Sequence, residues 1–400
     1  MHDVLITLNI GSTSLKFAVF RLRGKPERWI TGHFDAQDHL LCWNNELDSD
    51  ASPEPQPLKI SLVSAESLHS QVLNVVFERL KTYPIRIQGI VHRVVHGGGV
   101  YHGPMVIDQT MLERLESFSS WAPLHQPSCL DAIGFTKNRF PGVAQVACFD
   151  TAFHHTIPTT NSQFAIPRWL SRHGLRRYGF HGLSFQSILR QLGVRDPELV
   201  NRRLVIAHLG GGSSLCAVHH GKSVATTMGL TPLDGLPMAT RCGSIDPGLI
   251  LHLLQRKQMS VEHVSQLLYR ESGLRGISET SGDMRTLVAS ETPESREAVE
   301  VYVHRVAREI GAMMVDLQGL DGIIFTGGIG ENSALIREQV CRELHFVGVE
   351  LDPLANRRGA GCIHAESTAI HVWCLHSDED GEMAQQAYAF LTTSRTDYFK

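Results

Sequence analysis

The sequence predicts an α/β protein built from two related domains with a cleft between them. Apolar strand segments alternate with segments of helical periodicity along the whole chain, which is typical of α/β folds. Two similar stretches, GSTSLKFAV at 11–19 and GGGSSLCAV at 210–218, each join two apolar strands through a small polar turn. Such a repeat indicates an internal duplication. The chain has 400 residues, which is long for one hydrophobic core and favours two domains.

The composition is that of a soluble globular enzyme, with 42% hydrophobic and 20% charged residues. A net charge of -4 excludes the basic surface that nucleic acid requires. No apolar run approaches the roughly 20 residues that span a bilayer, and the start of the chain lacks the pattern of a signal peptide. The eight cysteines show no Cys-x-x-Cys spacing. We therefore expect reduced thiols in a cytoplasmic protein, without a disulfide framework or zinc site.

The first half opens with a strand, a tight turn and a second strand, because Leu5–Leu8 and Leu15–Phe20 are apolar. The polar, proline-rich stretch 44–57 predicts a surface loop. The expected helices cover about 68–81, 109–119 and 128–139, and further strands cover 87–95 and 143–148.

The second half is expected to begin with a meander of three strands. Its first two strands are 204–209 and 215–219, and a turn at 220–222 leads into the third. The expected helices are 246–257, 261–271 and 293–317, later strands are 322–325 and 369–375, and a last helix begins near 382. We place the first domain at 1–150 plus about 382–400, and the second at 151–381.

The opening turn carries side chains that suit a phosphate chain and its metal. Ser12 and Ser14 can donate hydrogen bonds to phosphoryl oxygens, Lys16 supplies positive charge, and Asn9 can orient a metal-bound water. An ordinary hairpin with a polar turn is the alternative interpretation.

Two arginines and two further side chains are typical of phosphoryl transfer. Arg93 ends an apolar strand and Arg241 precedes a helix, each beside a glycine-containing turn. Arginines from separate halves suit a clamp around a transferring phosphoryl group, although either one alone is more often part of a structural ion pair. Asp150 follows a strand, a usual place for an active-site carboxylate, and His181 lies in a glycine-flanked loop before a helix.

Two more glycine-rich turns, GGGSS and TGGIGENS, allow close approach of backbone to a ligand. The sequence contains neither GxxxxGK[ST] nor a GxGxxG that opens a βαβ unit. These turns therefore predict a nucleotide site that is neither a P-loop nor a dinucleotide fold.

A set of motifs spanning Asn9 to about Glu379 resembles the acetate kinase family in order and spacing. They are NIGSTSLKF, HRVVHGG, PLHQP, FDTAFH, YGFHGLS, HLGGGSS, TTMGLTPLDGL, TGGIGEN and SDED. The resemblance implies duplicated actin-like, ribonuclease H-like domains with an active-site cleft. It also implies reversible transfer of a phosphoryl group from ATP to acetate with Mg²⁺, or Mn²⁺ as an alternative. A homodimer formed through the second domain, with its long helix after Pro293, is implied as well.

The resemblance further implies residue roles. The catalytic residues would be Arg93, Asp150, His181 and Arg241. The metal residues would be Asn9 and Glu379. The acyl pocket would comprise Val95, Leu124, Phe180 and Pro232, with Arg93 holding the carboxylate. The nucleotide contacts would be Ser12, Ser14, Lys16, His208, Leu209, Gly210, Gly211, Gly212, Asp283, Met284, Arg285, Gly328, Ile329, Gly330, Glu331 and Asn332.

The sequence departs from the usual family pattern near the nucleotide. Gly211 replaces an asparagine, Met284 a phenylalanine, 225–228 an Asp-Thr-Ser-Met run, and 377–380 a Thr-Asn-Glu-Glu run. These changes bear on nucleotide affinity and donor preference, whereas the four catalytic candidates are unchanged. A propionate or butyrate kinase stays open, because one methylene changes discrimination by only about 1–3 kcal/mol. A non-catalytic nucleotide-driven clamp is disfavoured by the two arginines.

Overall fold

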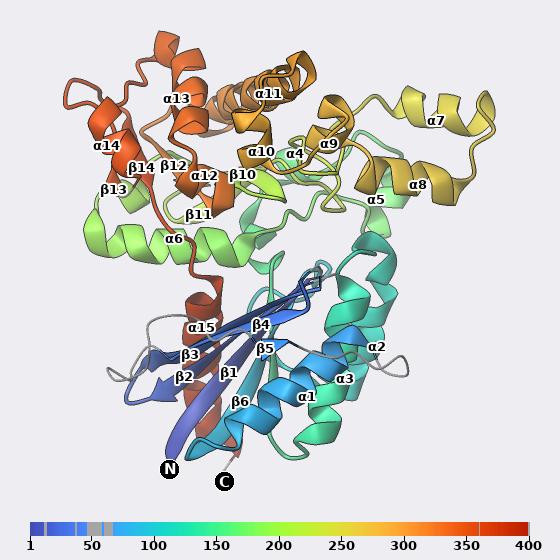
Figure 1. The fold of residues 1–400 in the computed structure, drawn as a ribbon, viewed down its shortest axis with the longest axis vertical. Helices are drawn as coiled ribbons and strands as arrows, with labels where there is room; N and C mark the ends of the chain where they lie inside the picture. Colours follow the sequence, from blue (N-terminus) through green and yellow to red (C-terminus); the bar gives the residue numbers. More distant parts are fainter. Residues whose placement is uncertain (12–13, 37, 46–57, 60–66, 360, 399–400) are drawn as a thin grey trace. The chain divides into compact units, whose positions relative to one another are not determined.

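The computed structural model describes residues 1–400 apart from 12–13, 37, 46–57, 60–66, 360 and 399–400. The chain divides into two compact units, Met1–Phe153 with Asp378–Lys400, and His154–Ser377. Each unit has its own β-sheet with helices packed against it (Figure 1). The predicted α/β class is therefore confirmed. Among the described residues, no helix is long and apolar enough to cross a membrane.

The first unit contains an eight-stranded sheet in the order β5-β4-β3-β2-β1-β6-β8-β7. Its strands are β1 (His2–Ile10), β2 (Ser14–Leu22), β3 (Pro26–Asp35), β4 (Leu40–Asn45), β5 (Leu58–Lys59), β6 (Ile85–Val94), β7 (Met105–Val106) and β8 (Ala144–Phe149). Strands β1, β6 and β8 are mutually parallel, while β1 to β5 form an antiparallel meander. The predicted loop at 44–57 is wrong at its start, where β4 ends, and its remainder lies outside the described residues.

Helices cover both faces of this sheet (Figure 1). They are α1 (Leu68–Leu80), α2 (Gln109–Ser117), α3 (Gln126–Arg139) and α15 (Glu379–Tyr398). Alternate residues of a strand point to opposite faces. Ile6 and Leu8 pack with α1, for example with Val72. Ala18 and Phe20 pack with Ala384 of α15 on the other face.

The second unit contains a six-stranded sheet in the order β11-β10-β9-β12-β14-β13. Its strands are β9 (Leu204–Leu209), β10 (Ser213–His219), β11 (Lys222–Thr226), β12 (Gly322–Thr326), β13 (Gly361–Cys362) and β14 (His371–Cys374). Its helices are α4 (Thr159–Ser162), α5 (Arg168–Arg172), α6 (Gly182–Arg195), α7 (Pro247–Gln255), α8 (Val261–Arg270), α9 (Gly273–Ser278), α10 (Met284–Ala289), α11 (Pro293–Leu317), α12 (Gly327–Asn332), α13 (Ala334–Glu343) and α14 (Pro353–Arg358).

The long helix α11 begins and ends where its sequence dictates. Thr292 caps it by accepting a hydrogen bond from the Ser295 backbone, and Pro293 occupies the first turn. It ends before Gln318, which adopts a left-handed conformation with φ of 56°. Its apolar side chains, including Tyr302 and Ile310, belong to the core of the unit.

The two sheets share one pattern, which supports the predicted duplication. The order β3-β2-β1-β6-β8 in the first unit matches β11-β10-β9-β12-β14 in the second. In both series the first three strands are antiparallel and the last three are parallel. The opening hairpin β1–β2 is thus equivalent to the glycine-rich hairpin β9–β10.

A second local prediction is also wrong. The TGGIGENS stretch was expected to be a turn, but residues 327–332 form the short helix α12. Glycine disfavours helices, so its abundance here conceals the helix from sequence patterns.

Candidate active site

The predicted catalytic side chains of the first unit lie at the carboxyl ends of adjacent parallel strands. Asn9 is near the end of β1, Arg93 near the end of β6, and Asp150 directly after β8. Thr7 bonds to Asp380 and Asn9 bonds to Glu379, both in the first turn of α15, so these side chains occupy the α15 face. Ligands of open α/β sheets bind at such strand ends.

Arg93 and Asp150 form a buried ion pair. The Asp150 side chain is 1% exposed and accepts hydrogen bonds from Arg93 Nε at 3.0 Å and Nη2 at 2.6 Å. Burial alone would lower the pKa of Arg93, but the carboxylates of Asp150 and Glu379 raise it above its ordinary value. Arg93 therefore stays charged, and Asp150 fixes the plane of its guanidinium.

Asn9 and Glu379 complete this group of polar side chains. Arg93 Nη1 donates to Asn9 Oδ1 at 3.0 Å and lies 3.5 Å from Glu379 Oε2. Asn9 Nδ2 donates to the same Glu379 oxygen at 3.1 Å. The structure thus brings together the predicted metal residues Asn9 and Glu379 and the predicted catalytic residues Arg93 and Asp150.

The opening turn is only partly described. Ser12 lies outside the described residues. Ser14 begins β2, and the Gly11 backbone N–H donates to the Ser14 carbonyl at 2.8 Å, which closes the turn. Lys16 is directly opposite Asn9 in the β1–β2 register and is exposed.

Two supporting side chains were missed in the sequence. Gln126 is fully buried; its amide accepts from the His96 backbone N–H at 3.1 Å and donates to the His96 carbonyl at 3.1 Å, which fixes the chain after Arg93. The Cys129 thiol donates to the Arg93 carbonyl at 3.0 Å. Burial raises the pKa of that thiol to about 12, so it remains protonated. The PLHQP motif was the only sequence signal for Gln126.

Each unit contains two of the predicted acyl-pocket residues. Val95, 6% exposed, and the half-buried Leu124 belong to the first unit. Phe180, 1% exposed, and the buried Pro232 belong to the second. Pro232 also accepts a hydrogen bond at its carbonyl from Arg241 Nη1 at 2.8 Å.

His181 stands at the start of α6 in a left-handed conformation with φ of 58°. Such a conformation is uncommon outside glycine and is often found at functional sites. Its Nδ1 shares a hydrogen bond of 2.8 Å with Ser214 Oγ. Its ring stacks on that of His208, with centroids 4.2 Å apart.

The glycine-rich turn after β9 brings His181 and Arg241 close together. A Cβ at Gly212 would lie 3.1 Å from Arg241 Nη2 and 3.4 Å from His181 Nε2. Gly210 lies beside the start of α12, because its Cβ would be 3.7 Å from the Gly328 nitrogen. A Cβ at Gly211 would meet nothing among the described residues within 4 Å. The turn thus joins both predicted catalytic side chains of this unit to two predicted nucleotide segments.

Glu331 stabilises the predicted nucleotide segment at α12 by accepting hydrogen bonds from backbone N–H groups. Its Oε1 accepts from the Gly327 and Ser377 backbone N–H groups at 2.9 and 3.1 Å, and His376 contacts Oε2 at 2.6 Å. Burial alone would raise the pKa of Glu331, but these hydrogen bonds lower it to about 2. The carboxylate therefore orders backbone at neutral pH.

Arg337 supports the other end of α12 and was missed in the sequence. Its side chain is 1% exposed, and Nη1 donates to the carbonyls of Gly330 and Glu331, each at 2.8 Å. Nε donates to Asn356 Oδ1 at 2.8 Å. Asn332 lies on this same helix and donates to the Gly328 carbonyl at 2.9 Å.

The remaining predicted nucleotide segment is at the start of α10. Asp283 caps this helix and pairs with Arg285, whose side chain is 90% exposed. Met284 is 4% exposed and packs in the core of the second unit. The Met284 side chain therefore contributes packing at this segment.

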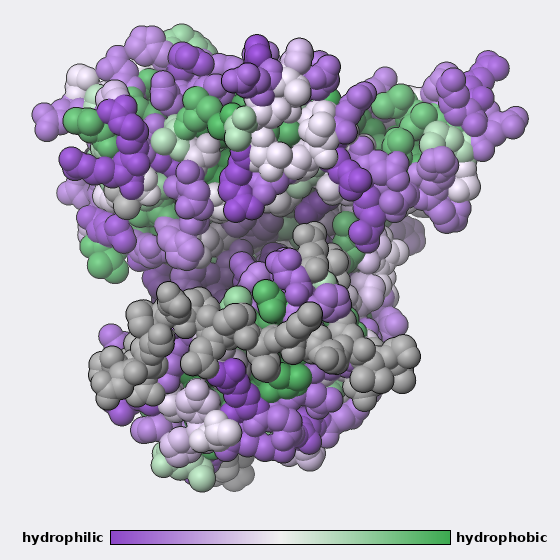
Figure 2. Space-filling model, viewed as in Figure 1, coloured by the Kyte–Doolittle hydropathy of each residue, from purple (hydrophilic) through white to green (hydrophobic). Residues whose placement is uncertain are grey.

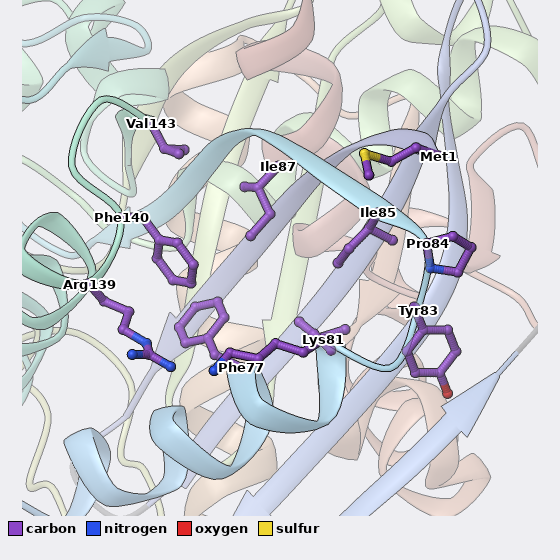
Figure 3. Close-up of a pocket in the computed structure, with 11 residues that line it drawn as sticks. Met1, Phe77, Lys81, Tyr83, Pro84, Ile85, Ile87, Arg139, Phe140 and Val143 are labelled. Carbon is purple, nitrogen blue, oxygen red and sulfur yellow. The ribbon is translucent and has the colours of Figure 1, made fainter.

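The first unit also has an apolar pocket of about 620 Å³ away from these residues. Figure 3 shows Phe77 of α1, Phe140 after α3, and Ile85 and Ile87 of β6 among its lining. Ile85 starts β6, whereas Arg93 lies at the far end of that strand. None of the predicted site residues lines this pocket.

Known protein families include one whose sequence pattern matches nearly the whole of this chain. The Acetokinase family matches residues 4–385. The chain belongs to the acetokinase family.

Individual relatives agree with this membership. A Rhodopseudomonas palustris protein named acetate kinase is 42% identical, with 99% of this chain and 100% of the relative covered. The structure of a propionate kinase from Francisella tularensis matches with a TM-score of 0.88 at 32% identity, covering 96% of this chain and 98% of that one. Porphyromonas gingivalis acetate kinase matches with a TM-score of 0.84 at 28% identity, covering 97% and 100%.

Acetokinase family membership implies ATP as substrate and a divalent metal. Asn9, Asp150 and Glu379 offer oxygen donors, which Mg²⁺ prefers, although Asn9 and Asp150 also bond to Arg93. Among the described residues, no group of three or more His, Cys, Asp or Glu could hold a metal alone.

Proposed function

We propose that this chain transfers the γ-phosphoryl group of ATP to acetate, reversibly, giving acetyl phosphate and ADP with Mg²⁺. The observation that carries the proposal is the 42% identity to a relative named acetate kinase over essentially both full lengths. The Arg93–Asp150 pair and the His181–Arg241 group give it a chemical basis.

The acetate carboxylate is the nucleophile and is already ionised at neutral pH, so no general base is needed. Asp150 acts instead by holding Arg93, since its carboxylate oxygens accept from Nε and Nη2. The described hydrogen bonds of Arg93 leave N–H groups of its guanidinium for the acetate carboxylate or the phosphoryl group. Val95, Leu124, Phe180 and Pro232 would surround the acetate methyl.

Residues of the second unit would hold the nucleotide and the charge of the transition state. Backbone N–H groups of the turn 210–212 and of α12 would approach the phosphates. His181 and Arg241 would stabilise the transferring group, and segment 283–285 would contact the nucleoside. Mg²⁺, held with Asn9 and Glu379, supplies neutralisation of phosphate charge. Catalysis would then consist of positioning and electrostatic stabilisation.

The two units would correspond to the two acetokinase domains, the second carrying the nucleotide segments. Arg93 belongs to one unit and Arg241 to the other. The eight cysteines show no Cys-x-x-Cys spacing in the sequence, and we propose a cytoplasmic location on that ground.

The hydroxamate assay tests this function directly. The purified chain is mixed with ATP, Mg²⁺ and acetate, propionate or butyrate, and the acyl phosphate is trapped as hydroxamate. We expect the highest kcat/KM with acetate. Absence of acyl phosphate with every carboxylate would refute the kinase assignment, and a preference for propionate would favour the second candidate. That candidate is supported by the likeness to a propionate kinase structure.

Val95→Ala should enlarge the acyl site. Loss of the branched methyls is expected to weaken acetate use modestly and to favour butyrate relative to acetate by about 1–2 kcal/mol in kcat/KM. Val94→Ala is the matched control, because Val94 is buried in a core cluster outside the proposed acyl pocket. An unchanged chain-length profile for Val95→Ala would remove Val95 from the pocket.

We also propose a homodimer formed through the second unit. The apolar residues of α11 pack mainly inside that unit, so they are not the best candidates for an interface. Helix α7 is almost entirely apolar, yet none of its residues is buried; Leu249 is 46% and Leu251 55% exposed. Figure 2 shows an apolar area over α7 and α8. Such an uncovered face is typical of an association surface.

Leu251→Glu should therefore disrupt the dimer. A symmetric interface loses the leucine twice. Full burial of a leucine stabilises by about 1.5–3 kcal/mol, and Leu251 has 55% of its surface left to bury, so the two copies together lose about 2–3 kcal/mol and dimerisation should weaken on the order of 100-fold. Light scattering at micromolar concentration should give twice the 44.4 kDa chain mass for the wild type and one chain mass for the variant. Val194→Glu, at an 83% exposed position on α6, is the control. A wild-type mass of one chain would overturn the dimer.

A further inference from the structure

Two stacked histidines of the second unit have matching surroundings. His181 bonds through Nδ1 to Ser214 Oγ at 2.8 Å, and its Nε2 would lie 3.4 Å from a Cβ at Gly212. His208 bonds through Nδ1 to Ser184 Oγ at 2.8 Å, and its Nε2 would lie 3.8 Å from a Cβ at Gly210. Each histidine therefore shares a hydrogen bond with a serine through Nδ1, and its Nε2 lies near the glycine-rich turn.

The serine beneath His208 has a second hydroxyl partner. Ser377 Oγ donates to Ser184 Oγ at 2.8 Å, and Ser184 is fully buried. A hydroxyl has a single proton. A hydroxyl that accepts a hydrogen bond is polarised into a stronger donor, and His208 Nδ1, 2.8 Å away, is the described acceptor for the Ser184 proton. The neutral imidazole must then carry its proton on Nε2, the nitrogen that faces the turn.

We propose that Ser377, acting through Ser184, is a positioning residue that holds His208 as an Nε2–H donor toward the phosphate-binding turn and fixes the stacked ring of His181. The inference rests on the proposed kinase function of this site. An Nε2–H group is a hydrogen-bond donor suited to a phosphoryl oxygen, whereas the other tautomer presents a lone pair there. The His208 ring also restricts the tilt of His181 through their stacking at 4.2 Å.

Ser377 is itself held by the nucleotide segment. Its backbone N–H donates to Glu331 Oε1 at 3.1 Å, and the same oxygen accepts from the Gly327 N–H at 2.9 Å. A continuous series of hydrogen bonds thus joins the start of α12 to His208. The position of α12 sets the position of Ser377, and Ser377 sets the tautomer of His208.

Replacement of Ser377 tests the proposal. In Ser377→Ala, Ser184 no longer accepts from Ser377 and becomes a weaker donor to Nδ1, so accepting from His208 Nδ1–H competes with donating to it and both tautomers should be populated. Nitrogen NMR of ¹⁵N-histidine-labelled protein distinguishes the tautomers, with the His208 signals assigned by their loss in His208→Asn. We expect an Nε2–H tautomer in the wild type and in Ser377→Thr, and a mixture in Ser377→Ala.

Kinetics provide the second readout. Ser377→Ala should lower kcat about tenfold, as expected for loss of one hydrogen bond that orients a catalytic group, with an unchanged KM for acetate. Ser377→Thr should restore kcat. Ser295→Ala is the matched control, because Ser295 is a fully buried serine of the same unit that accepts from the Thr292 hydroxyl at 2.8 Å. It should leave both kcat and the His208 signals unchanged.

The outcomes separate this proposal from the kinase assignment. If Ser377→Ala keeps a single Nε2–H tautomer at His208, the positioning role is refuted, whatever the activity. A lower melting temperature in Ser377→Ala with unchanged kcat and NMR signals would also refute it and assign Ser377 a structural role. Failure of the wild type in the hydroxamate assay would refute the kinase function, while the tautomer measurement on the same protein would still test the hydrogen bonds.

Discussion

Arg241→Lys is expected to lower kcat by about two to three orders of magnitude, the usual cost of losing one donor that stabilises transition-state charge. Arg241 Nη1 is used to hold the Pro232 carbonyl at 2.8 Å, while Nη2 faces Gly212 in the turn. The planar guanidinium can make both contacts at once, whereas a lysine ammonium keeps the charge but loses the fork. The KM for ATP should change much less, because the contact strengthens in the transition state.

The control for this substitution is Arg203→Lys in the same unit. Arg203 pairs with Asp321, with Nη2 and Oδ1 2.6 Å apart, and holds the start of β9 to the start of β12. Its replacement should lower the melting temperature and leave kcat nearly unchanged. Thermal midpoints and steady-state kinetics are measured on the same samples. A stably folded Arg241→Lys variant with near-normal kcat would remove Arg241 from the transition state.

The sequence predicted the placement of candidate site residues best where such a residue ends a buried strand. Arg93 and Asp150 follow long apolar runs, so their place at one edge of a sheet could be inferred from the order of residues alone. The hairpins at 11–19 and 210–218 likewise revealed the duplication that the two sheets share. Local sequence patterns sufficed here because the residues within each segment determine its secondary structure.

The supporting residues could not be predicted in this way. Gln126 bonds to His96, thirty positions away in sequence, and Arg337 bonds to Asn356, nineteen positions away. Neither side chain differs in type from an ordinary surface residue, and only the tertiary fold buries it. The strand β3 was missed for a related reason, since its burial does not alternate regularly and β-propensity depends on context.

Family motifs also mark segments more reliably than individual roles. Glu331 lies in a predicted nucleotide segment, yet its carboxylate accepts backbone N–H groups from Gly327 and Ser377. Met284 lies in another such segment, yet it packs in the core. In both places the side chain is engaged within the protein, so we expect the backbone to make any contact with a nucleotide.

Asp150→Ala is expected to cost the most stability of the substitutions considered. Removing one partner of a buried ion pair leaves an uncompensated charge, which typically lowers the free energy of unfolding by about 3–5 kcal/mol. Arg93 is 20% exposed and has Glu379 at 3.5 Å, so we expect the lower end of that range. Activity should fall by at least about 10²-fold, because Arg93 loses the carboxylate that orients its guanidinium.

The double variant Asp150→Ala, Arg93→Ala distinguishes an anchor for Arg93 from an independent catalytic group. If Asp150 acts only by holding Arg93, the kcat/KM of the double variant should be close to that of Arg93→Ala alone, because residues that act as a unit are not additive. Its melting temperature should exceed that of Asp150→Ala, since the unpaired charge is removed as well. Additive losses of kcat/KM in the double variant would show that Asp150 contributes to catalysis by a route of its own, and the anchoring role derived from the 2.6 Å contact would be wrong.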